Sequence, residues 1–236
     1  MHPIIAPEIF TLRPDFVAIS LSVRGARNGP SDDASEALLA RSVAGLDEAP
    51  WADAHLDAWR DAYRAFGAKP KRTPCSAEAL RKRARKDGRM RALNAVVDIY
   101  NAISLEFAIP VGGEDAESYD GRPRLCRASG QEPFHTTADG RPVVETPDPG
   151  EVIWRDDAGV TCRRWNWRQG PRTQITEDSR DMWFVLERLD PMPQTSLLQA
   201  GQALTDGLRR LSPDLTVSVL QFDAANPSGL ALSSIH

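Results

Sequence analysis

Apolar runs separated by turn residues predict alternating strands and helices along the chain. The continuous apolar run over 16–23 predicts a buried strand, which ends at turn residues in 25–30. A helix is expected over 31–45, with Ser31 as its N-cap. A second helix is expected between Pro50 and Gly67, because apolar residues recur there every three to four positions. Its apolar stripe consists of Ala52, Leu56, Trp59, Tyr63 and Phe66.

Two further helices are predicted before residue 110. The segment 76–87 predicts a strongly basic helix that lies largely on the surface, since it has few apolar positions. The segment 88–107 predicts a mostly buried helix that carries one polar stripe of Asn94, Asp98 and Asn101. Buried amide and carboxylate groups need hydrogen-bond partners or cost about 1–3 kcal/mol each. The stripe is therefore either a structural clasp on a neighbouring loop or one wall of a polar cleft.

The pattern changes after Pro110 to short β-rich runs between Gly, Pro and Asp turns. The strands expected there are 125–128, 150–154, 160–167 and 182–189. Arginine and tryptophan alternate over 162–168, and such a mixture can grip phosphate and stack on bases, or the tryptophans can simply be core. A leucine-striped helix over 197–211 and a strand over 215–222 follow. The pattern as a whole predicts an α+β fold.

The charge is unevenly distributed. The net charge is −4, yet between Arg60 and Arg91 twelve basic residues stand against three acidic ones, a local charge of +9. Such a block can bind a phosphate backbone by displacing counterions, although a charge run is also typical of a solvated helix face. The candidate RNA-binding residues are Lys69, Lys71, Arg72, Arg81, Arg83 and Arg85.

Missing motifs remove several function classes. The sequence contains no phosphate-binding glycine loop, no zinc-protease motif and no serine-hydrolase elbow. Its three cysteines are far apart and no His/Cys cluster has metal-ligand spacing, so we expect no metal, no cofactor and a reducing, cytoplasmic location. We also expect no signal peptide and no membrane span. A nucleophilic pair of Cys75 with His135 stays open.

A series of short motifs between Trp59 and Leu189 has a specific order and spacing. The motifs are Tyr63–Pro70, Asn94 with Asp98–Leu105, Pro110–Gly112, Gly130–Phe134, Pro149–Val152, Arg164–Arg168 and Arg172–Thr176. In these motifs the chain resembles the tRNA-binding editing domain, the third and fourth modules, of the phenylalanyl-tRNA synthetase β subunit, in a free-standing form. The resemblance implies a sandwich-like mixed β core flanked by helices. It also implies a single compact domain over 1–236, completed by the N-terminal strand and helix and the C-terminal helix and strand.

The same resemblance implies a function on tRNA. The synthetase domain hydrolyses tRNA that carries tyrosine in place of phenylalanine, and a free-standing relative would edit mischarged tRNA in trans. An aminoacyl ester is already activated, so a site needs to position a water, stabilise the oxyanion and reject the correct product. Two alternatives are a non-catalytic tRNA-binding module and a hydrolase or binder of small amino-acid-like molecules.

The resemblance also suggests site residues, on the hypothesis that the helix 88–107 and the segment 166–176 face each other across the cleft. Asn101 and Asn166 would bind the terminal ribose or the amino group, and Glu151 would orient water or amine. Thr173 and Thr176 would help to hold the attacking water, and Arg168 or Arg172 would meet the terminal phosphate. The expected catalytic residues are Asn101, Asn166, Thr173, Thr176 and Glu151, and the expected substrate-binding residues are Asn94, Asp98, Ser104, Trp167, Arg168 and Arg172. The sequence departs from the family pattern at Gln169, where an acidic residue is expected, and near Cys75, where a serine is expected.

Overall fold

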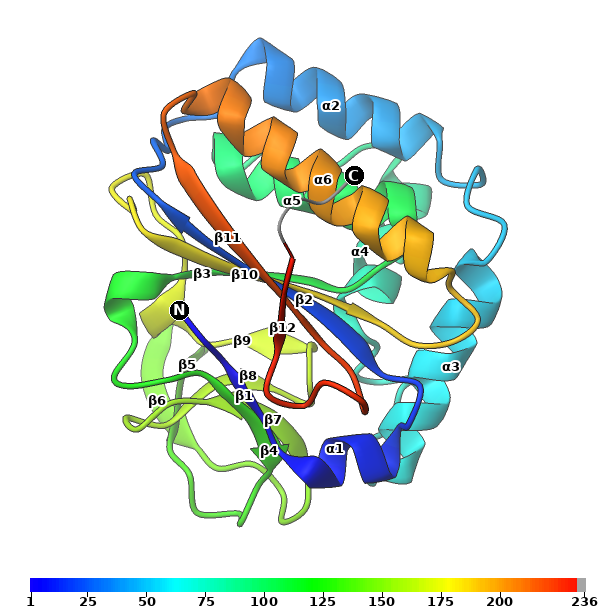
Figure 1. The fold of residues 1–236 in the computed structure, drawn as a ribbon, viewed down its shortest axis with the longest axis vertical. Helices are drawn as coiled ribbons and strands as arrows, with labels where there is room; N and C mark the ends of the chain where they lie inside the picture. The colour runs from blue at the N-terminus through cyan, green and yellow to red at the C-terminus, as the bar shows by residue number, and fades with distance from the viewer. Residues whose placement is uncertain (233–236) are drawn as a thin grey trace.

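Two five-stranded β-sheets, one two-stranded sheet (β5-β6) and six α-helices make up the computed structural model, which describes residues 1–232 (Figure 1). The helices are α1 (Pro7–Leu12), α2 (Asp33–Ala44), α3 (Ala52–Ala65), α4 (Ser76–Asp87), α5 (Ala95–Phe107) and α6 (Gln194–Leu211), with short 3₁₀ turns η1 (Ala116–Ser118) and η2 (Pro171–Thr173). The strands are β1 (Ile4–Ile5), β2 (Val17–Arg24), β3 (Val111–Asp115), β4 (Arg124–Arg127), β5 (Phe134–Ala138), β6 (Arg141–Glu145), β7 (Val152–Arg155), β8 (Val160–Arg163), β9 (Arg168–Gln169), β10 (Met182–Arg188), β11 (Thr216–Phe222) and β12 (Leu230–Leu232).

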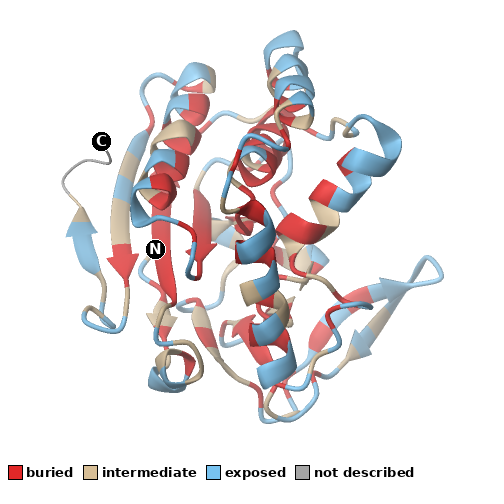
Figure 2. Ribbon diagram, turned by 90° about the vertical axis from the view of Figure 1, so that its right-hand side faces the viewer, coloured by how far each residue is buried: buried red, intermediate tan, exposed pale blue. Residues whose placement is uncertain are grey.

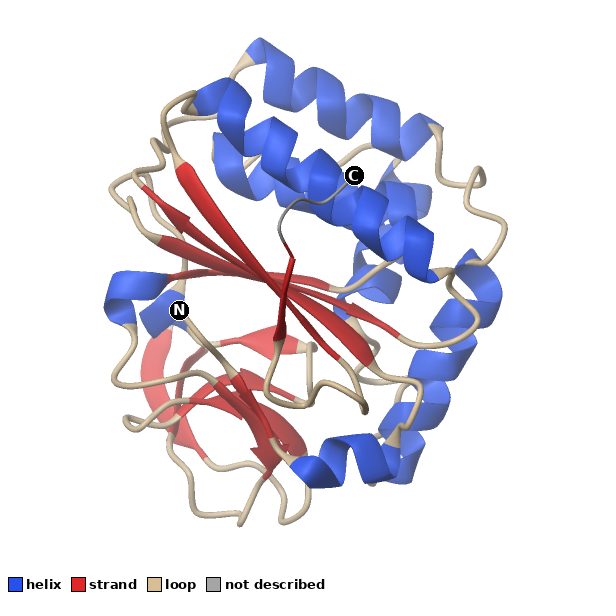
Figure 3. Cartoon of the chain, viewed as in Figure 1, coloured by secondary structure: helices blue, strands red, loops and turns tan. Residues whose placement is uncertain are grey.

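The two large sheets form the layers of the fold. The first has the order β12-β11-β2-β10-β3 and is antiparallel, whereas the second, β1-β4-β7-β8-β9, contains one parallel pair, β1 with β4. Helices α5 and α6 cover one face of the first sheet, and the second sheet lies on its other side (Figure 3). The predicted α+β fold with a mixed, sandwich-like β core and flanking helices is confirmed.

Strand β10 shows why the first sheet is buried on both faces. Phe184 and Leu186 point into the core beneath α5 and α6, while Trp183 and Val185 point into the core between the sheets. Every residue of β10 is buried, as expected for a strand covered on both sides (Figure 2). A charged residue in this strand, Glu187, therefore has to find its partners inside the protein.

Helix α5 begins later than the sequence pattern predicted. Gly88 ends α4 with φ of 65°, and Asn94 then caps α5 by accepting a hydrogen bond from the Val97 amide at 2.9 Å. The segment 88–94 is therefore a connection and not the first two turns of a helix. The prediction of one helix over 88–107 was wrong for this part.

Asp98 is the clasp that the polar stripe allowed. Its carboxylate accepts hydrogen bonds from the hydroxyls of Ser31 and Ser35 and, at 2.9 Å, from the amide of Leu93. The N-cap of α2 is Asp32, with a capping box to Ser35. The prediction of Ser31 as N-cap was wrong, because its hydroxyl joins α2 to α5 through Asp98.

The chain turns sharply after β8. Arg164 and Trp165 have φ of 48° and 66°, which a strand cannot contain, so the expected strand 160–167 ends at Arg163. The turn drives the Trp165 ring into the core between the sheets, with its centroid 5.2 Å from that of Trp59 and 5.1 Å from that of Phe16. Trp165 is thus a core residue that also reaches the edge of the pocket described below.

Helix α4 is basic, as predicted, but Arg81 does not lie on the surface. The residue is 1% exposed; its guanidinium donates at 2.7 Å to the carbonyl of Leu105 and also to the carbonyl of Leu46. Arg81 therefore satisfies carbonyls at the end of α5 and in the loop after α2. Its predicted contact with RNA was wrong.

Candidate functional site

A pocket of about 260 Å³ lies between the two sheets, at the edge formed by β3 and β9 and beneath α4 and α5. Because Glu114 and Glu187 both line it, we name it the carboxylate pocket. Its other polar lining residues are Ser76, Arg83, Tyr100, Asn101, Cys162, Asn166 and Gln169, and its aromatic ones are Trp154, Trp165, Trp167 and Trp183. The prediction that Asn101 and Asn166 share a cleft is consistent with this geometry.

Gly113 allows α5 to approach β3 at this edge. A Cβ atom at Gly113 would lie 2.8 Å from the Tyr100 ring and 2.9 Å from the Phe184 ring. Such distances are too short for any side chain, so the backbone of β3 packs directly against α5. This close approach is what brings Asn101, the residue after Tyr100, to the wall of the pocket.

Glu187 is held by three hydrogen-bond donors. Its Oε1 accepts from the indole nitrogens of Trp154 and Trp165, both at 3.1 Å, and its Oε2 accepts from Nδ2 of Asn166 at 2.9 Å. Burial raises the pKa of Glu187 to about 7, although these hydrogen bonds oppose the shift and the charge of Glu114 adds to it. The carboxyl group therefore titrates near neutral pH.

Asn166 is oriented from both ends. Its Oδ1 accepts a hydrogen bond from the Tyr63 hydroxyl at 2.8 Å, while its Nδ2 donates to Glu187. Tyr63 is fully buried on α3, so the amide is fixed between a helix and a strand. The carbonyl oxygen and the second N–H of the amide keep further hydrogen-bonding capacity for a ligand.

Glu114 is the second buried carboxyl group, 4% exposed at the end of β3. Burial raises its pKa to about 7, and a hydrogen bond from the Tyr119 hydroxyl to Oε2 and the charge of Arg172 oppose the shift. Two carboxyl groups that titrate near neutral pH in one pocket can both accept and donate protons. Neither residue was predicted from the sequence. The available signals were a single carboxylate within an apolar strand at Glu187 and a carboxylate next to a Gly-Gly pair at Glu114.

Gln169 occupies the pocket where an acidic residue was expected. Its Nε2 donates to the carbonyls of Gly113 and Thr173, both at 3.2 Å, and so ties β9 to β3. Ser76, adjacent to Cys75, lines the pocket as well, and its buried hydroxyl has no hydrogen-bond partner within the described chain. The acidic groups of the site thus come from other strands than the family pattern suggested.

Three residues of α5 that were expected to bind substrate lie outside the pocket. Asn94 caps the helix and accepts from Asn28 at 3.0 Å, Asp98 holds α2, and the Ser104 hydroxyl donates to the carbonyl of Ile109 at 2.7 Å. Their hydrogen bonds are used within the fold. We therefore correct their predicted role from substrate binding to structure.

Of the residues expected to handle water, Glu151 and Thr176 lie outside the pocket. Glu151 is 2% exposed and forms two hydrogen bonds of 2.7 Å with Arg163, so it is a buried structural carboxylate. Thr176 is exposed and lies outside the pocket lining. Thr173 is buried and does not line the pocket, but its side chain lies beside the carboxyl group of Glu114. The catalytic roles predicted for Glu151 and Thr176 do not fit these positions.

The two arginines expected to meet a phosphate differ in surroundings. Arg172 forms an ion pair of 2.7 Å with the buried Asp156. Arg168 is half-buried near the pocket, 6.0 Å from the ring centroid of Trp167, and Arg164 lies 4.5 Å from the same ring. Neither arginine lines the pocket: the Arg168 guanidinium donates to the carbonyl of Thr137 at 3.2 Å, and Arg172 is held by Asp156.

The thiols do not supply a nucleophile. Burial raises the pKa of Cys75 to about 12 and that of Cys162, in the pocket, well above its usual value. His135 is exposed on β5, opposite Val144 of β6, so the Cys75–His135 pair is not assembled. Over residues 1–232, no group of three His, Cys, Asp or Glu side chains could hold a metal ion.

Exposed basic residues lie on helix α4 and in the segments that precede and follow it. Several basic residues between 60 and 91 pair with acidic ones, for example Arg85 with Asp47 at 2.7 Å. The exposed ones without an ion-pair partner in the described part of the chain are Lys69, Lys71, Arg72, Arg83, Lys86, Arg89 and Arg91. Arg83 also lines the carboxylate pocket, so the pocket opens beside this basic surface.

Comparison with known proteins identifies the family. The model of the B3/4 domain matches residues 58–220, and the chain belongs to this family. Among solved structures, an N-terminal fragment of the phenylalanyl-tRNA synthetase β-subunit from Pyrococcus horikoshii aligns with a TM-score of 0.49 and 10% identity, over 93% of this chain and 51% of that one. The chain thus spans about half the length of that fragment. The comparison with curated proteins gave no match. No helix in residues 1–232 is long and apolar enough to cross a membrane.

Proposed function

We propose that this protein hydrolyses the ester bond of mischarged aminoacyl-tRNA in trans, in the cytoplasm. The observation that carries the proposal is the pairing, in one pocket, of Glu114 and Glu187, whose pKa values both lie at about 7, with the amides of Asn101 and Asn166. Ester hydrolysis needs a base near neutral pH and donors for the oxyanion. Membership of the B3/4 domain family supports a tRNA-related role.

The size of the pocket favours an aminoacyl group as its occupant. Its volume of about 260 Å³ lies below the ~300–1,000 Å³ of pockets for drug-sized ligands. The aromatic lining suits an amino-acid side chain, while the nucleic acid would stay outside, along the exposed basic face of α4. Arg83 stands where the two meet, because it belongs to both the pocket lining and that face.

In the proposed reaction, Glu114 acts as general base. It takes a proton from a water whose oxygen forms a bond to the ester carbonyl carbon, and the amides of Asn101 and Asn166 donate to the resulting oxyanion. The tetrahedral intermediate then collapses: the bond to the ribose oxygen breaks, and that oxygen takes the proton back from Glu114. The products are the free amino acid and uncharged tRNA, and no covalent enzyme intermediate is needed, in keeping with the protonated thiol of Cys162.

Glu187 is assigned a positioning role. Its two oxygens already accept three hydrogen bonds, one of them from Asn166, so it is suited to hold the amide and not to activate water. Arg83 is assigned to the terminal phosphates, because it lines the pocket and is exposed on the basic face of α4.

The test is a deacylation assay on a panel of separately mischarged tRNAs. We expect hydrolysis of at least one member by the wild type and a loss of about 10²-fold or more in Glu114→Gln and in Asn166→Ala. The matched control is Glu106→Gln, an exposed carboxylate of α5 outside the pocket. Binding without turnover on every member would leave a non-catalytic tRNA-binding module. Equal rates on free aminoacyl esters and on tRNA esters would favour a hydrolase of small amino-acid-like molecules.

A further inference from the structure

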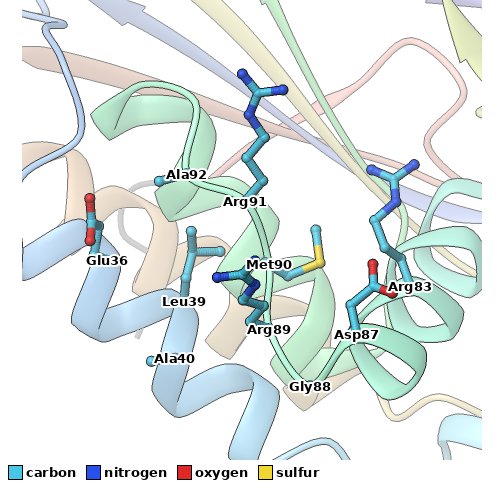
Figure 4. A pocket seen from close by; sticks show the side chains of 10 residues that line it. All are labelled: Glu36, Leu39, Ala40, Arg83, Asp87, Gly88, Arg89, Met90, Arg91 and Ala92. Atoms are coloured by element: carbon cyan, nitrogen blue, oxygen red, sulfur yellow. The ribbon is translucent and has the colours of Figure 1, made fainter.

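A second, larger hollow of about 860 Å³ lies between α2 and the segment that joins α4 to α5 (Figure 4). Its cationic lining residues are Arg83, Arg89 and Arg91, and its apolar ones include Leu39, Met90 and Ala92. In Figure 4, Leu39 from α2 and Met90 from the joining segment lie in the middle, with the three arginines around them. The hollow thus combines an apolar floor with a basic rim.

The joining segment gives the hollow this character. Gly88 ends α4 in a left-handed conformation, and the chain then runs without helix or strand to Asn94. Along it, Met90 packs against the small core formed around Leu39 while Arg89 and Arg91 stay exposed. The turn at Gly88 is therefore what puts two cations on either side of one apolar residue.

The charges of the three arginines are available to bind a ligand. Arg83, Arg89 and Arg91 make no ion pair within residues 1–232, although Glu36 and Asp87 also line the hollow. Across 82–91 the exposed side chains comprise six cations and one carboxylate. The field over the hollow is positive, which favours a polyanion over a cationic or neutral partner.

The hollow continues from the carboxylate pocket along one face of α4. Ser76, Leu80 and Arg83 line the pocket, and Arg83 and Asp87 line the hollow, so the spacing is that of successive helical turns. From Leu80 to Asp87 the helix rises roughly 10 Å. At ~3.4 Å per stacked nucleotide, this length corresponds to about three nucleotides of one strand.

We infer that the hollow binds the unpaired 3′ nucleotides of the RNA whose acylated end enters the carboxylate pocket. Arg89 and Arg91 contact their phosphates, and a splayed base lies against the half-buried Met90. Proteins bind single-stranded RNA by stacking its unpaired bases on aromatic side chains or on arginine guanidinium planes, whereas a duplex offers no free base. The three arginines of the hollow supply such planes. This inference rests on the proposed function, and it names the part of the tRNA that this surface takes.

The experiment measures binding of uncharged tRNA, so that it does not depend on hydrolysis. Two fluorescent transcripts are compared by anisotropy: an intact tRNA, and the same tRNA without its unpaired 3′ nucleotides. The proteins are wild type, the double variant Arg89→Glu/Arg91→Glu, its neutral counterpart Arg89→Gln/Arg91→Gln, and a matched control, Arg209→Glu/Arg210→Glu, in the last turn of α6. Unfolding midpoints verify that each variant is folded.

We expect the Arg89/Arg91 variants to weaken binding of intact tRNA at least tenfold and to lower its salt slope by about two, with the Gln pair weaker in effect than the Glu pair. Removal of the 3′ nucleotides should cost the wild type a similar factor, and the two losses should not add, because both remove the same contact. The Arg209/Arg210 control should bind both transcripts as the wild type does.

Equal weakening of both transcripts, or additive losses, would overturn the inference, since the arginines would then contact the duplex. Unchanged binding of intact tRNA would overturn it too. These outcomes are separate from failure of the proposed function: a positive binding result without deacylation of any mischarged tRNA leaves this inference standing and removes the hydrolase. No binding of tRNA at all removes both.

Discussion

Asn166 and Glu187 are joined by a hydrogen bond of 2.9 Å between Nδ2 and Oε2, deep in the carboxylate pocket. The other end of the amide accepts from Tyr63, and the other carboxylate oxygen accepts from two indoles. The whole network therefore has one arrangement of donors and acceptors, with an acceptor required at Oε2. This makes the site sensitive to changes that preserve shape but exchange an acceptor for a donor.

Glu187→Gln is the change that tests this sensitivity. An amide nitrogen at the position of Oε2 would face Nδ2 of Asn166, two donors in contact, and Asn166 would have to flip. We expect a loss of about 1–3 kcal/mol in the free energy of unfolding, measured with urea at pH 8, and a deacylation rate reduced along with it. Tyr63→Phe is the companion variant, because it removes a partner of Asn166 without placing a donor against it. A Glu187→Gln protein as stable as the wild type would contradict the network.

Glu114 is expected to make the free energy of unfolding depend on pH between about pH 5 and 8. Its pKa in the folded state is raised to about 7, above the ordinary value of 4.5, so its contribution to stability is fully present below pH 4.5 and is lost as pH rises through 7. A shift of this size corresponds to a change on the order of 3 kcal/mol. Glu114→Gln cannot ionise and keeps an acceptor for Tyr119, so its free energy of unfolding should vary less between pH 5 and 8.

The matched control for this pH series is Glu117→Gln, an exposed carboxylate three residues further on. Denaturant unfolding of the three proteins at each pH gives the slopes. Identical slopes in the wild type and Glu114→Gln would mean that Glu114 does not hold a proton in the folded protein.

His55 is expected to lower the free energy of unfolding as the pH falls, whereas Glu114 lowers it as the pH rises. His55 is fully buried, Nδ1 donates to the carbonyl of Ala108 at 2.9 Å, and Nε2 accepts from the Trp59 indole and the Leu189 amide. Burial lowers its pKa to about 4 from 6.5, so its contribution to stability is present above pH 6.5 and is lost as pH falls through 4. We expect His55 to account for a loss of about 3 kcal/mol over this range.

NMR titration of the His55 ring checks this prediction directly, and it should show a neutral imidazole protonated at Nδ1 at pH 6. His135, exposed on β5, provides the internal comparison. A His55 ring that becomes charged near pH 6.5 without loss of structure would contradict the assignment.

Arg81 and Arg83 are neighbours on α4 with opposite expected effects. Arg81→Met leaves the carbonyls of Leu105 and Leu46 without their donor, and we expect it to cost about 2–4 kcal/mol of stability. Arg83→Met removes an exposed cation, so it should leave stability within ~0.5 kcal/mol and lower the salt slope of tRNA binding by about one. Thermal unfolding and anisotropy on both variants test the pair. A stable Arg81→Met protein with weakened RNA binding would restore the role first predicted for Arg81.

Elements formed by interactions between residues close in the sequence were predicted well, and those that depend on other interactions were not. Strand β2, helix α3 and helix α6 were predicted nearly to their ends, because the apolar periodicity that buries them is local. The start of α5 was missed, because it depends on a left-handed glycine and a side-chain cap that the apolar pattern overrode. The hairpin β5–β6 and strand β3 were missed because these strands are short and contain few apolar residues.

The site was predicted in part for the same reason. Asn101, Asn166 and Trp167 reach the pocket, but Glu114 and Glu187 were not foreseen, since their chemistry arises from burial between two sheets that are distant in the sequence. Conversely, Glu151 had the right residue type near the right motif, and its partner Arg163 could be recognised only in three dimensions. The residue types showed which positions are polar, but only the tertiary packing shows whether a polar side chain lines the pocket or stabilises the fold.

The close packing at Gly113 divides the carboxylate pocket into a rigid half and an adjustable half. At Gly113 the backbone of β3 is pressed against Tyr100 and Phe184, so this position of the wall tolerates no side chain. On the side of α4 the wall consists of the partly exposed side chains of Ser76, Ala79 and Leu80, which lie outside the large cores between the layers. An engineer who wants the pocket to admit a larger or smaller amino acid should therefore redesign α4 and leave the sheet untouched.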